Sequence, residues 1–290
     1  MLVLIFQQIV NGLIVGGIYS LTAAGVSLTY GVLRVLNLAQ GEMYMLGAYI
    51  ALTVVTVMHA PYFVGILASF MAIGVLGIVA ERVALRPVRK SGTMYAYITT
   101  FAVSFIIQNI AVLVWTADPR IFPSGLAQIN LSIGGVYFTM QQLMVFIACW
   151  VIIGLLYCLI KFTKFGLAIR AVSQSTDTAN LMGIPVNYVV SMTFALATGL
   201  AGVAGALIGP SMLVYPGMGA LTGMKIYAVI LMGGLGNVFG TSLAGFLLGA
   251  IEGVFASFVG STFRDVMPFL VIIAILLYKP SGLFSRSSSK

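Results

Sequence analysis

The chain has 290 residues, of which 61% are hydrophobic and 7% are charged. A soluble domain needs more polar surface than this composition supplies, so we interpret the chain as a helical protein that crosses a membrane several times. The formal net charge of +8 comes mostly from bases gathered in a few loops, which indicates membrane topology and contact with anionic lipid rather than nucleic-acid binding.

Apolar segments follow one another along the chain, most of them long enough to span a bilayer. They cover residues 8–31, 42–58, 62–81, 94–116, 139–160, 187–209, 219–233, 239–259 and 266–278. The seventh and ninth segments are short for a full crossing, which indicates tilted, broken or re-entrant helices. The sequence therefore predicts an all-α fold, a polytopic membrane helix bundle of about eight to nine spans that forms one transmembrane domain over residues 1–290.

Basic residues are concentrated in three of the loops. Lys and Arg gather in residues 81–90, 161–170 and 279–290, whereas residues 116–138 and 210–220 are poor in both. Loops on the cytoplasmic side of a membrane carry an excess of Lys and Arg. We therefore predict that the three basic segments are cytoplasmic, that the N-terminus lies outside and that the C-terminus lies in the cytoplasm.

The passage between the first two apolar segments, residues 34–44, interrupts the hydrophobic pattern. Asn37 suits an N-cap with Gln40 three residues later, the spacing of a capping box, and Glu42 falls in the first helical turn. Transporters bind solutes at such helix breaks near the membrane midplane. We predict that Asn37, Gln40, Gly41 and Glu42 line or support a solute path, with helix N–H groups for a carboxylate and Glu42 for an ammonium group. The alternative is a capped turn at the water interface.

Residues 161–186 form the one long polar passage of the chain. Three bases come first, then a run rich in Ser, Gln, Thr, Asp and Asn, then Gly183 and Pro185, which are typical of a helix end. This pattern predicts a short cytoplasmic helix that docks a soluble partner. An ordinary positively charged loop is the alternative.

Glycines at four-residue spacing predict close helix packing at three places. They are Gly12 with Gly16, Gly205 with Gly209, and the run Gly245, Gly249 and Gly253. Packing within one subunit is favoured over a subunit interface. A second break at residues 233–241 holds four glycines around Asn237, for which a turn is favoured over a solute site.

Two charges stand in apolar surroundings near the C-terminal end, Lys225 and Glu252. At a rise of 1.5 Å per residue, each lies about 10 Å from the outer end of its helix, and the two helices are consecutive and antiparallel. We predict that they form an intramembrane ion pair. In the alternative, Lys225 extends to the outer headgroups and Glu252 faces a water-filled cavity.

The residue types needed for metal or covalent chemistry are scarce. His59 is the only histidine, and the two cysteines, Cys149 and Cys158, fall nine positions apart in one apolar segment. We therefore expect no metal site, no disulfide within that helix, and no nucleophilic catalysis.

Five passages together resemble one family, the permease subunits of bacterial branched-chain amino-acid ABC transporters, and among these the first of the two permease subunits. They are RVLNLAQGEMYMLGAY (34–49), ERVALRPVR (81–89), residues 170–184, GGLGNVFGTSLAG (233–245) and YKPSGLF (278–284). In the first passage, Leu38 and Gln40 stand where the family usually has Phe and His.

This resemblance implies a permease subunit of an importer that moves branched-chain amino acids across the bacterial inner membrane. It implies as partners a second permease subunit, two ATP-binding subunits, an extracytoplasmic solute-binding protein and membrane lipid. It also implies a cytoplasmic coupling segment over residues 161–186, with Arg170, Ala171, Asp177, Ala179 and Gly183 in the positions of its motif. The sequence has no Gly-x-x-x-x-Gly-Lys-Ser/Thr loop, so we expect ATP and Mg on partner subunits, no cofactor in this chain, and no enzyme activity of its own.

Three other functions are weighed against this one. A permease for urea or short amides would use a similar scaffold. A proton-coupled secondary transporter would need an intramembrane carboxylate that titrates, for which Glu252 is the candidate. An intramembrane hydrolase would need an acid pair, or a Ser with a base, and the apolar segments offer neither.

Overall fold

The computed structural model describes residues 2–89, 91–123, 129–133, 136–259, 266–279 and 282–284. These residues are almost entirely helical. The helices are α1 (Leu2–Leu33), α2 (Gln40–Thr56), α3 (Tyr62–Ala80), the π-helical turn η1 (Glu81–Leu85), α4 (Arg86–Val88), α5 (Thr93–Trp115), α6 (Met140–Phe162), α7 (Lys164–Gln174), α8 (Thr176–Leu181), α9 (Val186–Ile208), the 3-10 turn η3 (Gly209–Ser211), α10 (Met218–Gly233), α11 (Val238–Val259) and α12 (Met267–Tyr278). The strands β1 (Asn130–Ile133) and β2 (Val136–Thr139) pair antiparallel.

Each of the nine predicted apolar segments coincides with a helix of the structure. Within the described residues, six helices are long and apolar enough to cross a membrane, so the predicted all-α membrane bundle is confirmed. The other three, α2, α10 and α12, have 17, 16 and 12 residues. A full crossing needs about 20 residues, so helix length does not confirm the predicted count of eight to nine spans.

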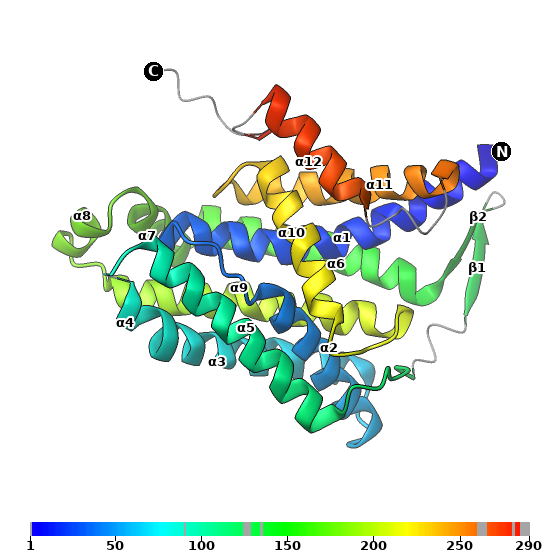
Figure 1. Ribbon diagram of the computed structural model, residues 1–290, viewed down its shortest axis with the longest axis horizontal. Coiled ribbons are helices and arrows are strands. Elements are labelled where there is room, and N and C mark those ends of the chain that lie inside the picture. Colours follow the sequence, from blue (N-terminus) through cyan, green and yellow to red (C-terminus); the bar gives the residue numbers. More distant parts are fainter. Residues whose placement is uncertain are drawn as a thin grey trace.

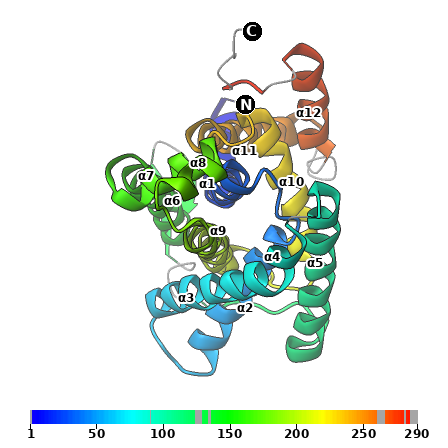
Figure 2. The same ribbon diagram turned by 90° about the vertical axis from the view of Figure 1, so that its left-hand side faces the viewer.

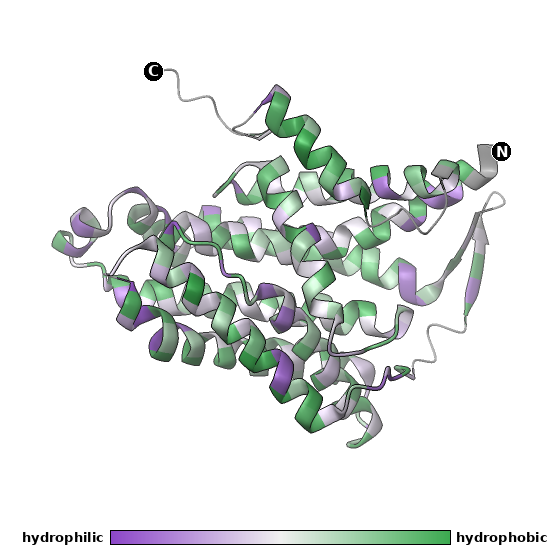
Figure 3. Cartoon of the chain, in the orientation of Figure 1, coloured by the Kyte–Doolittle hydropathy of each residue, from purple (hydrophilic) through white to green (hydrophobic). Residues whose placement is uncertain are grey.

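The long helices run side by side along the long axis of the molecule (Figure 1). Helices α4, α7 and α8 lie at one end, and the N-terminus and the β1–β2 hairpin lie at the other (Figure 1). Helix α10 crosses the long helices steeply (Figure 1). Apolar residues dominate the helices, whereas polar residues gather around α7, α8 and the hairpin (Figure 3). The predicted cytoplasmic tail beyond residue 284 lies outside the described residues.

Helices α1 and α9 form the centre of the bundle. In their most apolar stretches, 72% of the residues of α1 and 83% of those of α9 are buried, against 17% in α5. Seen along the long axis, α5 stands at the edge of the bundle beside α10, and α3 and α6 lie on other sides of α9 (Figure 2). The apolar faces that α5 leaves exposed need contact with lipid or with another membrane subunit.

The glycines at four-residue spacing pack inside this chain. A Cβ atom on Gly16 would lie 2.8 Å from the carbonyl oxygen of Gly245 and 3.2 Å from Cα of Gly249, so the backbones of α1 and α11 are in direct contact. Gly12 and Gly253 meet the opposite helix in the same way. The predicted packing within one subunit is confirmed for α1 and α11.

Candidate functional site

Helix α1 ends at Leu33 and α2 begins at Gln40, so the chain breaks where the sequence predicted. The predicted capping box is wrong, because the residue that precedes α2 is Ala39, which has no side-chain cap. Asn37 instead shapes the turn before it: its Oδ1 accepts from the backbone N–H of Ala39 at 3.2 Å, and its Nδ2 donates to Gln40 Oε1 at 3.2 Å. An Asn side chain favours such a turn by bonding the backbone two residues on.

Gln40 and Gly41 fix the start of α2 against two other helices. Gln40 is fully buried, and its Nε2 donates to the carbonyl oxygen of Ala197 in α9 at 2.9 Å. A Cβ atom on Gly41 would lie 3.0 Å from the carbonyl carbon of Gly219 and 3.1 Å from Cα of Gly223. Because Gly41 has no side chain, the first turns of α2 and α10 touch at this point.

Glu42 lies at this junction of α2 and α10. Its side chain is buried, with the residue 3% exposed, and within the described part of the chain its Oε2 atom has no hydrogen-bond partner. A Cβ atom on Gly219 would lie 2.7 Å from that oxygen. The Ser104 side chain of α5 lies beside the carboxylate. An intramembrane carboxylate with an unused acceptor is costly to bury and points to a functional site.

The structure therefore brings together the four predicted path residues, and it adds two that sequence reasoning missed. Ser104 faces Glu42, and Tyr227 of α10 donates to the carbonyl oxygen of Asn37 at 3.1 Å. Asn37, Gln40 and Glu42 are each at most 3% exposed, so these three side chains are closed off from solvent in this conformation. A small polar residue within the apolar stretch of α5 was the only sign of Ser104 in the sequence.

Lys225 of α10 and Glu252 of α11 are in direct contact, as the depth of the two residues predicted. Lys225 Nζ lies 2.7 Å from Glu252 Oε1, and the two residues are 9% and 0% exposed. Lys225 Nζ also donates to the hydroxyl of Tyr19 at 3.3 Å and lies 5.7 Å from the centre of the Tyr19 ring. The alternative in which Lys225 extends to the headgroups is wrong.

The polar passage folds into two short helices rather than one, α7 and α8. Thr163 caps α7 by accepting from the N–H of Gly166 at 3.0 Å, and Ser175 caps α8 by accepting from the N–H of Thr178 at 3.2 Å. Because Ser175 has extended backbone angles, φ −155° and ψ 117°, the chain turns between the two helices.

The motif residues of this segment have different environments. Arg170, Asp177 and Gly183 are exposed, Ala171 is half-buried and Ala179 is buried. Gly183 has φ 80°, a left-handed conformation that suits glycine. Sequence reasoning missed the exposed apolar pair at the end of α8, Leu181 and Met182, which are 87% and 79% exposed.

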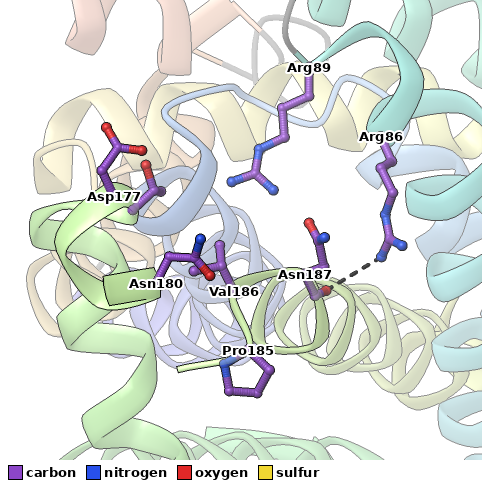
Figure 4. Close-up of a pocket in the computed structure, with 8 residues that line it drawn as sticks. Arg86, Arg89, Asp177, Asn180, Pro185, Val186 and Asn187 are labelled. Atoms are coloured by element: carbon purple, nitrogen blue, oxygen red, sulfur yellow. Dashed lines mark hydrogen bonds between the residues drawn. The ribbon is translucent and has the colours of Figure 1, made fainter. Parts of the chain in front are cut away.

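A cleft of about 690 Å³ separates α8 from α4 and the start of α9. Arg86 and Arg89 reach into it from one side, and Asp177 and Asn180 of α8 face them (Figure 4). Arg86 Nη2 donates to the carbonyl oxygen of Asn187 at 3.4 Å (Figure 4). The cleft therefore lies between the polar segment and the helical turns that follow α3.

The described residues contain neither a cluster of metal ligands nor a paired cysteine. Among them, no group of three or more His, Cys, Asp or Glu side chains is placed to hold a metal ion. Cys149 is buried, Cys158 is exposed, and both are free thiols.

Comparison with known proteins gives the family. Residues 8–276 match the family model described as branched-chain amino acid transport system / permease component. The high-affinity branched-chain amino acid transport system permease protein BraD of Pseudomonas aeruginosa is 32% identical over 293 residues, with 97% of this chain and 95% of that protein covered. The corresponding protein LivH of Escherichia coli is 29% identical over 296 residues, with the same coverage. A probable branched-chain amino acid transport permease protein LivH of Methanocaldococcus jannaschii is 28% identical over 295 residues, covering 96% of this chain and 92% of that protein. The chain belongs to the family of permease components of branched-chain amino acid transport systems.

Proposed function

We propose that this chain is one permease subunit of an ATP-driven importer that moves branched-chain amino acids across the bacterial inner membrane. The observation that carries the proposal is Glu42, a buried carboxylate at the junction of α2 and α10 with one oxygen to which no described residue donates. The family and the relatives named above support the transport role.

Asn37, Gln40, Gly41 and Glu42 form the solute path of this proposal. A zwitterionic amino acid brings an ammonium group, which suits the Glu42 carboxylate, and a carboxylate, which suits the positive end of the α2 dipole. Gln40 and Asn37 hold the start of α2 in place through their bonds to Ala197 and Ala39. In this arrangement Glu42 contacts the solute, and Asn37, Gln40 and Gly41 position Glu42.

The partners follow from the same proposal. They are a second permease subunit, two ATP-binding subunits that hold ATP and Mg, an extracytoplasmic solute-binding protein, and lipid. The N-terminus faces outside and the C-terminus faces the cytoplasm. The basic segments around α4 and α7 lie at one end of the bundle, which supports a single cytoplasmic face (Figure 1).

In this proposal the whole chain is one permease domain, in which residues 161–186 dock on an ATP-binding subunit. Arg170, Ala171, Asp177, Ala179 and Gly183 belong to that surface. Its support is the exposed apolar pair Leu181 and Met182 at the tip of α8, because large exposed apolar groups beside polar ones are typical of a protein interface.

The test is uptake of labelled leucine by the complete transporter in liposomes, at a leucine concentration below half-saturation. Glu42→Gln removes the charge with little change of volume, and we expect uptake to fall about 10- to 100-fold, the loss of a charge-assisted hydrogen bond. Asp118→Asn is the control, because Asp118 is an exposed loop carboxylate. Normal uptake by Glu42→Gln would show that the four residues only form the start of α2 and do not bind the solute. Uptake of labelled urea in place of leucine would favour the amide permease.

A further inference from the structure

A second cavity is bounded on one side by Lys225 of the Lys225–Glu252 pair. Its volume is about 340 Å³, and Tyr19, Tyr44, Tyr215, Met218, Thr222 and Lys225 are among the residues that line it. Small-molecule sites have volumes of about 300–1,000 Å³, so the cavity has the size of a binding site. Glu42 is not among its lining residues.

The cavity presents one member of an ion pair and hides the other. Lys225 lines the wall, with its side chain 11% exposed. Glu252 is 0% exposed and is not among the lining residues, so it lies behind the ammonium group. The bonds from Lys225 Nζ to Glu252 and to the Tyr19 hydroxyl, at 2.7 Å and 3.3 Å, keep the cation oriented. A ligand that enters therefore meets an oriented positive charge.

The remaining walls are apolar and aromatic. Three tyrosine rings and the Met218 side chain offer contact to an aliphatic group. The Lys225–Glu252 pair has no net charge, so a zwitterion adds none on entry, whereas a free anion would. Such a cavity favours a small aliphatic molecule that carries a carboxylate and an ammonium group together.

We propose that this cavity is a second subsite for the amino acid, in which Lys225 binds the solute carboxylate, and Glu252 and Tyr19 position Lys225. The subsite rests on the proposed function, because it takes the solute of that transport reaction. It also connects to Glu42. Gly219 touches Glu42, and Lys225 lies six residues further along α10, about 9 Å at 1.5 Å per residue. The helix α10 therefore joins this subsite to the Glu42 site.

The experiment measures binding of L-leucine to the purified complete transporter in nanodiscs, without the solute-binding protein. The double variant Lys225→Met with Glu252→Gln removes both charges and leaves no unpaired ion. We expect it to bind leucine about 10- to 100-fold more weakly than the unchanged transporter. Leucinol lacks the carboxylate, so we expect the unchanged transporter and the double variant to bind leucinol with equal affinity. Arg82→Met, an exposed cation elsewhere, is the matched control and should bind leucine normally.

A second variant keeps the ion pair and blocks the space. Thr222→Phe places a ring in the cavity, and we expect loss of leucine binding although Lys225 and Glu252 are unchanged. Equal leucine binding by the double variant, full binding by Thr222→Phe, or no binding by the unchanged transporter would each overturn the subsite.

Uptake by the unchanged transporter with its binding protein separates the two proposals. If it imports no leucine, the proposed function fails. If it imports leucine while the double variant binds and imports equally well, the subsite alone fails.

Discussion

Arg86 Nη2 lies 3.1 Å from Glu81 Oε2, five residues away across the π-helical turn η1. The backbone N–H of Arg86 bonds to the carbonyl oxygen of Glu81, the five-residue spacing of a π-helix. Ser191 of α9 donates to the same carboxylate oxygen at 2.6 Å and accepts from Arg86 Nη2 at 2.8 Å. The three side chains join the end of α3 to the first turns of α9, directly after the polar segment.

Removal of Arg86 should destabilise the protein more than neutralisation of Glu81. Glu81 is buried, with its side chain 1% exposed, whereas Arg86 is 37% exposed. In Arg86→Met the carboxylate stays buried with Ser191 as its remaining bonded side chain, at a cost of about 1–3 kcal/mol. In Glu81→Gln the guanidinium still reaches water, so we expect a smaller loss. Thermal unfolding of the transporter in nanodiscs compares the two, and a larger loss in Glu81→Gln would contradict this account.

The Lys225–Glu252 pair should show strong coupling in a double-mutant cycle. Lys225→Met leaves Glu252 charged and buried, and Glu252→Gln does the same to Lys225, at about 3–5 kcal/mol for each change. The double variant should be less destabilised than the sum of the two, because it leaves no unpaired charge. Thermal unfolding and subunit assembly measure all four proteins. Additive losses would show that the pair contributes no interaction energy.

Gly183 should tolerate asparagine and reject valine. Its φ of 80° is accessible to glycine and, at a small cost, to asparagine, but it is strained for a β-branched residue. Among the described residues, no atom lies within 4 Å of a Cβ added there, so the difference between the two variants comes from the backbone alone. We expect Gly183→Val to hydrolyse ATP without matching leucine uptake and Gly183→Asn to remain coupled. Equal coupling ratios in both variants would remove Gly183 from the docking surface.

Gly249 should not accept a side chain. A Cβ there would overlap the backbone of Gly12 and Gly16 in α1. Overpacking of a tight contact costs about 1–3 kcal/mol or more, so Gly249→Val should lower the thermal stability and the yield of assembled transporter. Gly154→Ala in α6 is the control, because a Cβ on Gly154 would have no atom of the described chain within 4 Å. An assembled and stable Gly249→Val protein would mean that α1 and α11 can separate without loss.

Residue patterns along the chain were sufficient to predict the nine apolar helices, because the apolar length of a segment is a local property. The same holds for the contact of Lys225 with Glu252, whose depth follows from counting residues along two consecutive helices. The glycine spacing likewise predicted the contact of α1 with α11. The start of α2 was placed wrongly at Asn37, because a bond from Asn37 to the Ala39 N–H competes with the capping geometry.

Only the tertiary structure decided which polar side chains are hydrogen-bonded within the chain and which keep an unbonded atom for a ligand. Gln40 is bonded to Ala197, 157 positions away, and so is structural. Glu42 has Ser104 and Gly219 as neighbours and keeps one oxygen unbonded among the described residues. The pairing of Glu81 and Arg86 with Ser191 depends on a π-helical turn that the sequence pattern did not predict. These contacts join residues far apart in the chain, and no local periodicity reports them, because they depend on how the helices pack.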